Sequence, residues 1–504
     1  MALLTIHIED GRKEVREATI GDTLLQAMGD EAVHLQTPCG GTGRCGKCRV
    51  RASGDLSQPT DMEVRSLGED LQEGWRLACL ATIQGDAEVT LSLEQDMNRI
   101  QAGGQLPEFQ WDPLFTTYGA AVDIGTTTLA ARLYDRKGML ASATAVNPQR
   151  TYGADVISRI EKSMAGSGPE LAQCIWDSLS DLLKELAQKA KIDPKQIDSA
   201  VITGNTTMLY LLTEKDPTCL SCAPFLADDL FGRFAEKGEI RIPAFEDLQI
   251  YLPACIGAFV GGDIATALLP GGIYKNEGTK LMVDIGTNGE LALTHDGKML
   301  CTSTAAGPVF EGAGISSGMQ GGPGAIDEIL WENGAPKIHT IDNKPPVGIC
   351  GSGIIDGMAV LVEQELVDET GAFEDLDELE LADGISITQK DVRMIQLAKG
   401  AVCAGIMTLL DLAQIEPDHL DELQIAGGFG SYIDLHNAGR IGLFPAELEN
   451  KTRVMGNAAL TGASMLLLRK EYMDILKKVT AESECVELSS NPVFVDNYMD
   501  CMEF

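Results

Sequence analysis

The chain repeats one pattern, first as Val122-Asp123-Ile124-Gly125-Thr126-Thr127-Thr128 and again as Val283-Asp284-Ile285-Gly286-Thr287-Asn288-Gly289. Each copy is a short apolar strand, an aspartate and a Gly/Thr turn, and a second strand follows at Leu129–Tyr134 and at Glu290–Thr294. The pattern predicts a β-hairpin whose tight turn offers backbone N–H groups and hydroxyls to an anion such as phosphate. The aspartate at the lip of each turn can hold Mg²⁺ through water.

A third glycine-rich stretch, Ile-Ala-Gly-Gly-Phe-Gly at Ile425–Gly430, follows a predicted strand at Leu423–Ala426. A single Gly/Thr turn would say little about function. Two copies about 160 residues apart, together with this third loop, indicate two similar lobes that close on one nucleotide.

Length and composition limit the number of domains and the classes of partner that the chain can have. The 504 residues allow roughly three or four domains, and 44% of them are apolar, which is enough to bury large cores. The formal net charge of −36 disfavours nucleic acid as a partner, since an acidic surface repels the phosphate backbone.

The first ten residues lack the basic and apolar regions of a signal peptide, and no apolar run approaches the length of a membrane-spanning helix. We therefore expect a cytoplasmic protein without a membrane partner. In a reducing compartment its 13 cysteines are expected to bind metal or to be buried, and not to form disulfides.

Four of the cysteines, Cys39, Cys45, Cys48 and Cys79, have the spacing C-x5-C-x2-C-x30-C. Three thiolates in a glycine-rich loop can wrap one side of a small cluster, and the fourth closes the site from a distant segment. The set suits a [2Fe–2S] centre or a structural zinc, but zinc sites usually show two short Cys knuckles and this chain has one. The pattern resembles plant-type and adrenodoxin-type ferredoxins, with five residues in the first gap where the plant type has four. The resemblance implies a β-grasp fold.

These landmarks divide the chain into four expected segments. Residues 1–94 are the ferredoxin-like domain, 95–117 a linker, 118–279 the first lobe and 280–504 the second lobe. The linker contains Trp111 and Phe115, so we expect it to drape over one of the domains instead of extending into solvent.

Other polar positions are weaker candidates. Asn205 lies in a small polar loop after a predicted strand at Asp198–Thr203, and ligands of open α/β sheets collect at such strand ends. Asp263 follows Gly261 and Gly262 and is either an active-site carboxylate or a helix cap. Asp155 and Arg159 are four residues apart and are expected to pair on one face of a helix.

The order hairpin, hairpin, glycine-rich loop resembles the actin, hexokinase and acetate kinase superfamily of two-lobed ATPases with a ribonuclease H-like fold. The resemblance implies an α+β and α/β architecture in which the first two loops grip phosphates and the third lies under the adenosine. Carried over, it implies a first phosphate loop of Asp123, Gly125, Thr126, Thr127 and Thr128. It implies a second loop of Asp284, Gly286, Thr287, Asn288 and Gly289, and an adenosine loop of Gly427, Gly428, Phe429 and Gly430.

A ferredoxin unit ahead of such an ATPase resembles the reductive activators of corrinoid proteins, which serve corrinoid-dependent methyltransferases. The resemblance covers nearly the whole chain, including Tyr152–Arg159, Thr203–Met208, Gly261–Asp263, Ile349–Gly353 and Gly427–Asp434. Longer members carry an extra domain between the linker and the first phosphate loop, where this chain has only 23 residues, which leaves monomer or homodimer open.

The resemblance implies an ATP-dependent one-electron transfer that returns Co(II) of a corrinoid protein to Co(I). The cysteine cluster would relay the electron from an unidentified donor, and Asp123, Asp284 and Asp263 would serve Mg²⁺ and ATP hydrolysis. Alternatives are an ATP-driven electron donor to another low-potential enzyme, a small-molecule kinase with a redox-sensing ferredoxin domain, and a non-enzymatic nucleotide switch. Cys219 and Cys222 form a C-x-x-C without a second pair nearby, so their role stays open.

Overall fold

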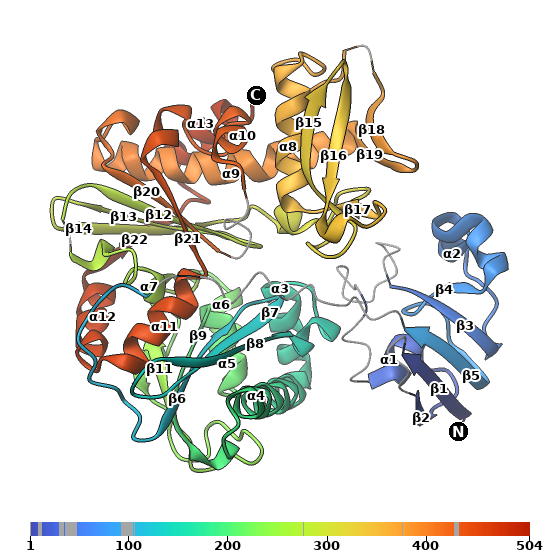
Figure 1. The fold of residues 1–504 in the computed structure, drawn as a ribbon, viewed down its shortest axis with the longest axis horizontal. Helices are drawn as coiled ribbons and strands as arrows, with labels where there is room; N and C mark the ends of the chain where they lie inside the picture. Colours follow the sequence, from blue (N-terminus) through green and yellow to red (C-terminus); the bar gives the residue numbers. More distant parts are fainter. Residues whose placement is uncertain are drawn as a thin grey trace.

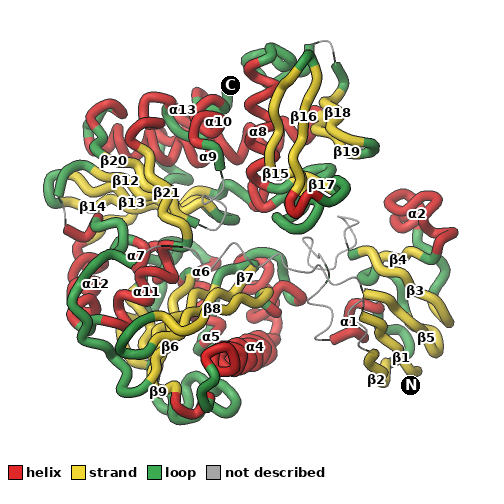
Figure 2. Tube along the Cα trace, in the orientation of Figure 1, coloured by secondary structure: helices red, strands yellow, loops and turns green. Residues whose placement is uncertain are grey.

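The computed structural model describes residues 2–8, 13–29, 35, 48–91, 104, 106–275, 277–374, 376–427 and 433–504. A small N-terminal unit, drawn in blue in Figure 1, lies beside two larger lobes. Each unit is built on its own sheet, and Figure 2 shows the helices that cover the sheets of the two lobes. The chain therefore has the mixed α+β and α/β character expected from its sequence.

The N-terminal unit is a five-stranded sheet in the order β2-β1-β5-β3-β4. Its strands are β1 (Ala2–Ile8), β2 (Lys13–Ala18), β3 (Arg49–Leu56), β4 (Trp75–Leu77) and β5 (Ile83–Leu91). The first strand and the last run parallel, and the other pairs are antiparallel. The helices α1 (Leu24–Met28) and α2 (Asp61–Leu67) pack on this sheet, in the β-grasp arrangement expected of a ferredoxin.

The two lobes contain sheets with the same core topology. In the first lobe the order is β10-β11-β9-β6-β7-β8, and in the second it is β21-β20-β12-β13-β14-β22. Each has an antiparallel three-strand meander, and two further strands extend the sheet in parallel from its first strand. This repeated topology is the structural counterpart of the repeated sequence pattern.

The bounds of the first-lobe strands are β6 (Tyr118–Ile124), β7 (Thr128–Tyr134), β8 (Met139–Val146), β9 (Ile197–Gly204), β10 (Phe231–Phe234) and β11 (Gln249–Ala254). The second-lobe strands are β12 (Lys280–Ile285), β13 (Gly289–His295), β14 (Lys298–Thr304), β20 (Glu422–Ala426), β21 (Thr452–Gly456) and β22 (Ser483–Cys485). Both predicted hairpins are therefore present, as β6–β7 and β12–β13.

The helices of the first lobe are α3 (Val156–Lys162), α4 (Gly168–Ala190), α5 (Thr206–Leu212), α6 (Thr218–Ser221) and α7 (Gly262–Ala267). The later helices are α8 (Gly351–Glu363), α9 (Gln389–Ala413), α10 (Leu435–Arg440), α11 (Ala458–Leu468), α12 (Glu471–Glu482) and α13 (Pro492–Asp500). Two small sheets complete the second lobe: β16-β15-β17 (Ala335–Thr340, Ala325–Glu332, Gly348–Ile349) and β18-β19 (Glu378–Ala382, Ile385–Thr388).

The end of the chain crosses from the second lobe back to the first. The helix α11 packs on β6, β9 and α7, and α12 packs on β11, which Figure 1 shows as red helices within the first lobe. The close approach of α11 to α7 requires glycine at position 462, since a Cβ there would lie 1.9 Å from the Thr266 carbonyl oxygen. The expected assignment of all of residues 280–504 to the second lobe is therefore corrected for α11 and α12.

The described part of the linker lies on the first lobe, as expected from its aromatic residues. The ring of Trp111 meets that of Tyr134 edge to face, with centroids 6.3 Å apart, and Phe115 is fully buried. Backbone bonds from Asp112 and Leu114 to α11 continue this contact.

The helix α9 is long and apolar enough to cross a membrane by length and composition. In the structure, 78% of its most apolar window is buried within the protein. It packs on β13 and β14, so it is a core helix of the second lobe.

Candidate functional site

The turns of the two hairpins meet through one carboxylate. Thr127 Oγ1, in the first turn, donates a hydrogen bond of 2.9 Å to Glu311 Oε2. Thr287 Oγ1, in the second turn, donates one of 2.9 Å to Glu311 Oε1. The two predicted phosphate loops are thus brought to one place, one from each lobe.

The predicted carboxylates converge at the same place. Burial is the main cause that raises the pKa of Asp123 to about 7 and that of Asp284 to about 7, and their mutual repulsion and that of Asp263 add to it for Asp284. Burial also raises the pKa of Asp263 to about 6 and carries the pKa of Glu290 well above its ordinary value. Buried carboxylates that lie close together disfavour one another's ionised form. A divalent cation among them would stabilise that ionised form.

The first turn is braced by amides and a buried cation. Asn147 Nδ2 donates to the Gly125 carbonyl at 2.8 Å, and the Asn147 backbone N–H donates to that of Thr127 at 2.8 Å. Arg159, with no exposed surface, donates to the Thr126 carbonyl at 2.6 Å and to the Gly153 carbonyl at 2.9 Å. These bonds fix the carbonyls of the turn in place without any ligand.

Asp155 attracts Arg159 by charge, but the two side chains do not form the hydrogen-bonded pair expected on the helix face. Asp155 is the N-cap of α3, and its Oδ1 accepts the Ser158 N–H at 2.8 Å. Capping of the helix engages the carboxylate that would otherwise reach the next turn. Arg159 instead points inward to the first phosphate loop.

Asn205 and Asp263 lie beside the two turns. Asn205 Nδ2 contacts Thr126 Oγ1 at 3.3 Å, while its Oδ1 caps α5 through the Met208 N–H at 2.9 Å. Asp263 is not the cap of α7, because Gly261 holds that position; the Asp263 carboxylate faces the other acids. A Cβ on Gly261 would lie 2.5 Å from Asn205 Cα, so the two loops touch.

The third loop begins against the second hairpin. Gly427 has φ of 96°, and a Cβ there would lie 2.8 Å from Asp284 Oδ1. This position therefore needs glycine both for its left-handed backbone and for its closeness to the carboxylate. Gly428, Phe429 and Gly430 lie outside the described residues, so their predicted role as the adenosine loop stays a prediction.

Two of the four cluster cysteines are described, and they are adjacent. Cys48 Sγ and Cys79 Sγ are 3.2 Å apart, both side chains are buried, and the Ala78 N–H donates to the Cys48 carbonyl at 2.8 Å. Two sulfurs held side by side are what one metal centre requires of two of its ligands. Cys39 and Cys45 lie outside the described residues.

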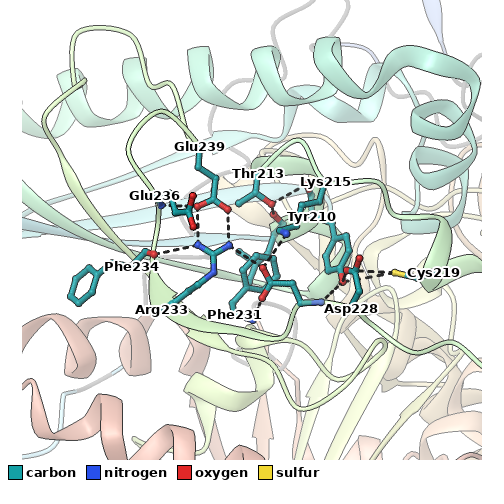
Figure 3. Close-up of polar contacts among 12 residues, drawn as sticks. Tyr210, Thr213, Lys215, Cys219, Asp228, Phe231, Arg233, Phe234, Glu236 and Glu239 are labelled. Atoms are coloured by element: carbon teal, nitrogen blue, oxygen red, sulfur yellow. Dashed lines mark hydrogen bonds and ion pairs between the residues drawn. The ribbon is translucent and has the colours of Figure 1, made fainter.

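The C-x-x-C segment belongs to a polar network on the surface of the first lobe (Figure 3). Cys219 Sγ lies 3.8 Å from the Tyr210 hydroxyl, which also contacts Asp228 and accepts the Asp229 N–H at 2.8 Å. Arg233 ties Asp229 to Glu239 through bonds of 2.9 and 2.6 Å. The network holds a loop of the lobe in place, and Cys222 is exposed.

Four residues of the site were not predicted from the sequence: Asn147, Glu290, Glu311 and Asn457. The last of these, Asn457, donates from Nδ2 to Asp123 Oδ2 at 3.0 Å. Glu290 had a signal, because a two-strand hairpin places it directly opposite Asp284. The others come from segments up to 334 positions away along the chain, for which one sequence carries no contact signal.

Among the residues that the structure describes, no group of three or more His, Cys, Asp or Glu side chains is arranged to hold a metal ion by itself. Asp123, Asp284 and Asp263 are the predicted carboxylates that lie close enough to influence one another.

Comparison with known proteins gives three family matches that follow one another along the chain. Residues 7–84 match the 2Fe-2S iron-sulfur cluster binding domain, residues 118–276 the RACo middle region, and residues 278–504 the C-terminal domain of RACo, the ASKHA domain. The first match favours [2Fe–2S] over zinc for the four-cysteine pattern.

Similar proteins cover most of the chain. Corrinoid activation enzyme RamQ of Eubacterium limosum is 37% identical over 76% of this chain and 69% of its own length. The [Co(II) methylated amine-specific corrinoid protein] reductase of Methanosarcina barkeri is 27% identical over 72% of this chain and 73% of its own length. The solved structure of a reductive activator for corrinoid, iron-sulfur protein aligns over 99% of this chain and 98% of that one, with a TM-score of 0.71 and 26% identity.

Proposed function

Since this chain belongs to the RACo family of reductive activators of corrinoid proteins, we propose that it passes one electron to Co(II) of a corrinoid protein and uses ATP to do so. The observation that carries the proposal is the meeting of two phosphate loops from two lobes in a chain that also begins with a ferredoxin unit. The names of the relatives support a corrinoid protein as the acceptor.

The residues around the two turns fit MgATP. The turns Gly125–Thr128 and Gly286–Gly289 would supply the donors to phosphate, with Asn205 beside them. The N–H groups of Gly125 and Gly286 are not among these donors, because carbonyls of their own turns accept them. Asp123 and Asp284 would hold Mg²⁺ through water, and Asp263 supports them from α7. Gly427 begins the loop that we propose for the adenosine.

On the electron side, Cys48 and Cys79 supply two adjacent buried sulfurs, and Cys39 and Cys45 complete the proposed ligand set. A [2Fe–2S] cluster bound there supplies one-electron redox chemistry. Cys48 and Cys79 belong to the same buried apolar core as Leu35, Leu77 and Ala81.

One contact supports coupling between the two halves. Arg150 Nη2 donates to the Leu35 carbonyl of the ferredoxin unit at 2.6 Å. Arg150 lies on the short 3-10 turn Pro148–Thr151, whose N-cap is Asn147, the residue that binds the first phosphate loop. The first phosphate loop, where we propose that nucleotide binds, and the ferredoxin unit thus both contact the segment Asn147–Thr151. Closure of the lobes would then change the affinity for the corrinoid partner.

The proposal is tested with anaerobically reduced protein, MgATP and a Co(II) corrinoid protein, with Co(I) followed by its absorbance. We expect Cys79→Ala to abolish Co(I) formation and to leave ATP hydrolysis intact, whereas Cys222→Ala, which removes an exposed thiol, leaves both unchanged. Reduction by the wild-type protein that does not depend on ATP, or no reduction at all, would contradict the proposal.

Two further assignments belong to the same proposal. We place the protein in the cytoplasm, where a low-potential donor and a corrinoid methyltransferase system meet. The net charge of −36 supports a protein partner over nucleic acid.

A further inference from the structure

Glu311 lies between the two predicted phosphate loops and contacts a threonine of each. It ends the 3-10 turn Pro308–Glu311, which follows β14 of the second lobe. Its two carboxylate oxygens each accept one hydroxyl, Thr127 from the first lobe and Thr287 from the second, both at 2.9 Å. The side chain is thus a direct polar link between the lobes at the proposed nucleotide site.

The position of Glu311 is built into the fold. Val309 and Phe310, before it in the turn, are each 2% exposed and belong to the core of the second lobe. Gly312, after it, has φ of 80°, and a Cβ there would lie 2.3 Å from the Met319 carbonyl oxygen. The turn is therefore anchored on both sides, and the carboxylate is held against the two threonines.

The chemistry of the threonines creates a conflict with a nucleotide. A threonine hydroxyl has a single hydrogen to donate. While Thr127 and Thr287 donate to Glu311, neither can donate to a phosphate oxygen. A carboxylate at this place also repels the phosphate charge. Nucleotide and Glu311 therefore compete for the same two donors.

We propose that Glu311 is a further positioning residue of the ATPase: it occupies the phosphate-binding hydroxyls of both lobes and holds the lobes together until nucleotide phosphates displace it. The inference rests on the proposed nucleotide site. Exchange of one anion for the other links nucleotide binding to the relative position of the two lobes, because the Thr127–Glu311 bond between the lobes then breaks.

The test uses the full chain and the variant Glu311→Gln, which keeps the size of the side chain but loses the charge and one of its two acceptor oxygens. Binding of Mg²⁺ with a non-hydrolysable ATP analogue is measured by calorimetry. We expect Glu311→Gln to bind the analogue about 5–150-fold more tightly, the range typical of coupled equilibria. The matched control is Glu328→Gln, an exposed acid of the same lobe, which should leave the affinity unchanged.

A second readout needs no nucleotide. Small-angle X-ray scattering of the nucleotide-free protein should show a larger radius of gyration for Glu311→Gln than for wild type. Thr127→Val, which removes the bond between the lobes, should raise the radius of gyration in the same way, whereas Thr287→Val, which removes a bond within the second lobe, should not.

The outcomes separate the two claims. Unchanged or weaker binding of the analogue by Glu311→Gln, or unchanged scattering, would overturn the role of Glu311. Failure of the wild-type protein to bind the analogue would instead overturn the proposed nucleotide site. A structural role alone would lower the melting temperature of the variant without tightening the binding of the analogue.

Discussion

The turn between β6 and β7 is held by a buried guanidinium and by amides, whereas the turn between β12 and β13 is surrounded by carboxylates. Across the first hairpin Asp123 faces Ala130, and Asn457 donates to its carboxylate at 3.0 Å. Across the second hairpin Asp284 faces Glu290. Asp263 lies close enough to both aspartates to raise their pKa values further, so the acid across the hairpin is what distinguishes the second turn. The two repeats have nearly the same sequence and opposite surroundings.

This difference indicates a division of labour between the loops. The first loop is organised by the protein itself, because Arg159 and Asn147 fix its carbonyls before any ligand binds. The second loop has several neighbouring carboxylates, whose negative charge either protons or a bound cation can compensate. We therefore expect the first loop to depend on protein contacts and the second to depend on Mg²⁺, and three predictions test that contrast.

The largest effect is expected at the first loop. Arg159→Met would leave the carbonyls of Thr126 and Gly153 without a charged donor, and each such bond is worth about 1.5–3 kcal/mol. We expect ATP hydrolysis to fall by about 100-fold or more, as measured by phosphate release. Lys162→Met, which changes an exposed cation on the same helix, should have no effect. Near-normal hydrolysis by Arg159→Met would show that the first loop does not need this brace.

The next effect concerns pH and the second loop. Mg²⁺ requires ionised carboxylates, and the pKa values of Asp123 and Asp284 are raised to about 7 and that of Asp263 to about 6. Below these values protons compete with the metal, so the apparent Mg²⁺ affinity in the presence of nucleotide should rise with pH up to about 7, by about tenfold per unit for each proton displaced.

Calorimetry in two buffers of different ionisation enthalpy counts the protons released when Mg²⁺ and nucleotide bind. Asp284→Asn should flatten the pH dependence more than Asp123→Asn, because Asp284 is the carboxylate that faces a second acid. Equal flattening by the two variants would remove the contrast between the hairpins.

The smallest effect is on stability without metal. The pKa of Glu290 is raised in the folded protein, so the folded state holds its proton more tightly than the unfolded chain does. Its contribution to stability is full below the unfolded pKa and is lost as the pH rises through the folded value. Glu290→Gln removes that loss and should stabilise the metal-free protein at pH 8, but not at pH 4.

Thermal unfolding in EDTA measures this gain as a rise of several degrees in Tm. Asp123→Asn should gain less, because Asn457 already compensates part of the charge of Asp123. Lower stability of Glu290→Gln at pH 8 would mean that the carboxylate is better satisfied in the folded protein than its neighbours indicate.

Much of the fold was predictable because it is encoded locally. The hairpins follow from an apolar strand, an Asp and a Gly/Thr turn, and the long helix at Gly168–Ala190 from its amphipathic spacing. The return of α11 to the first lobe was not predictable from local pattern. Its sequence is apolar all round, which predicts burial without indicating against which sheet.

The residues of the site also divide into those that the local sequence pattern predicts and those that only tertiary packing brings to the site. Asp123, Asp284 and Thr287 lie within the repeated motif, and their convergence follows from the symmetry of the two lobes. Glu311 lies in a glycine-rich loop that resembles any flexible segment in sequence, and its role depends on an anchor formed by Val309 and Phe310 in three dimensions. Arg159 was expected to pair with Asp155 on a helix face, since its burial against the first turn cannot be inferred from helix spacing.

The passage of α11 into the first lobe has a consequence for how the protein can be divided. A cut in the chain at the boundary near residue 277 gives a first fragment whose β6 and β9 have lost their covering helix, and a second whose apolar α11 has no sheet to cover. Neither fragment is a complete folding unit, so separately expressed halves should aggregate unless they are produced together and reassemble. A frameshift after residue 456 would likewise strip Asp123 of its amide partner, although the two positions lie in different thirds of the gene.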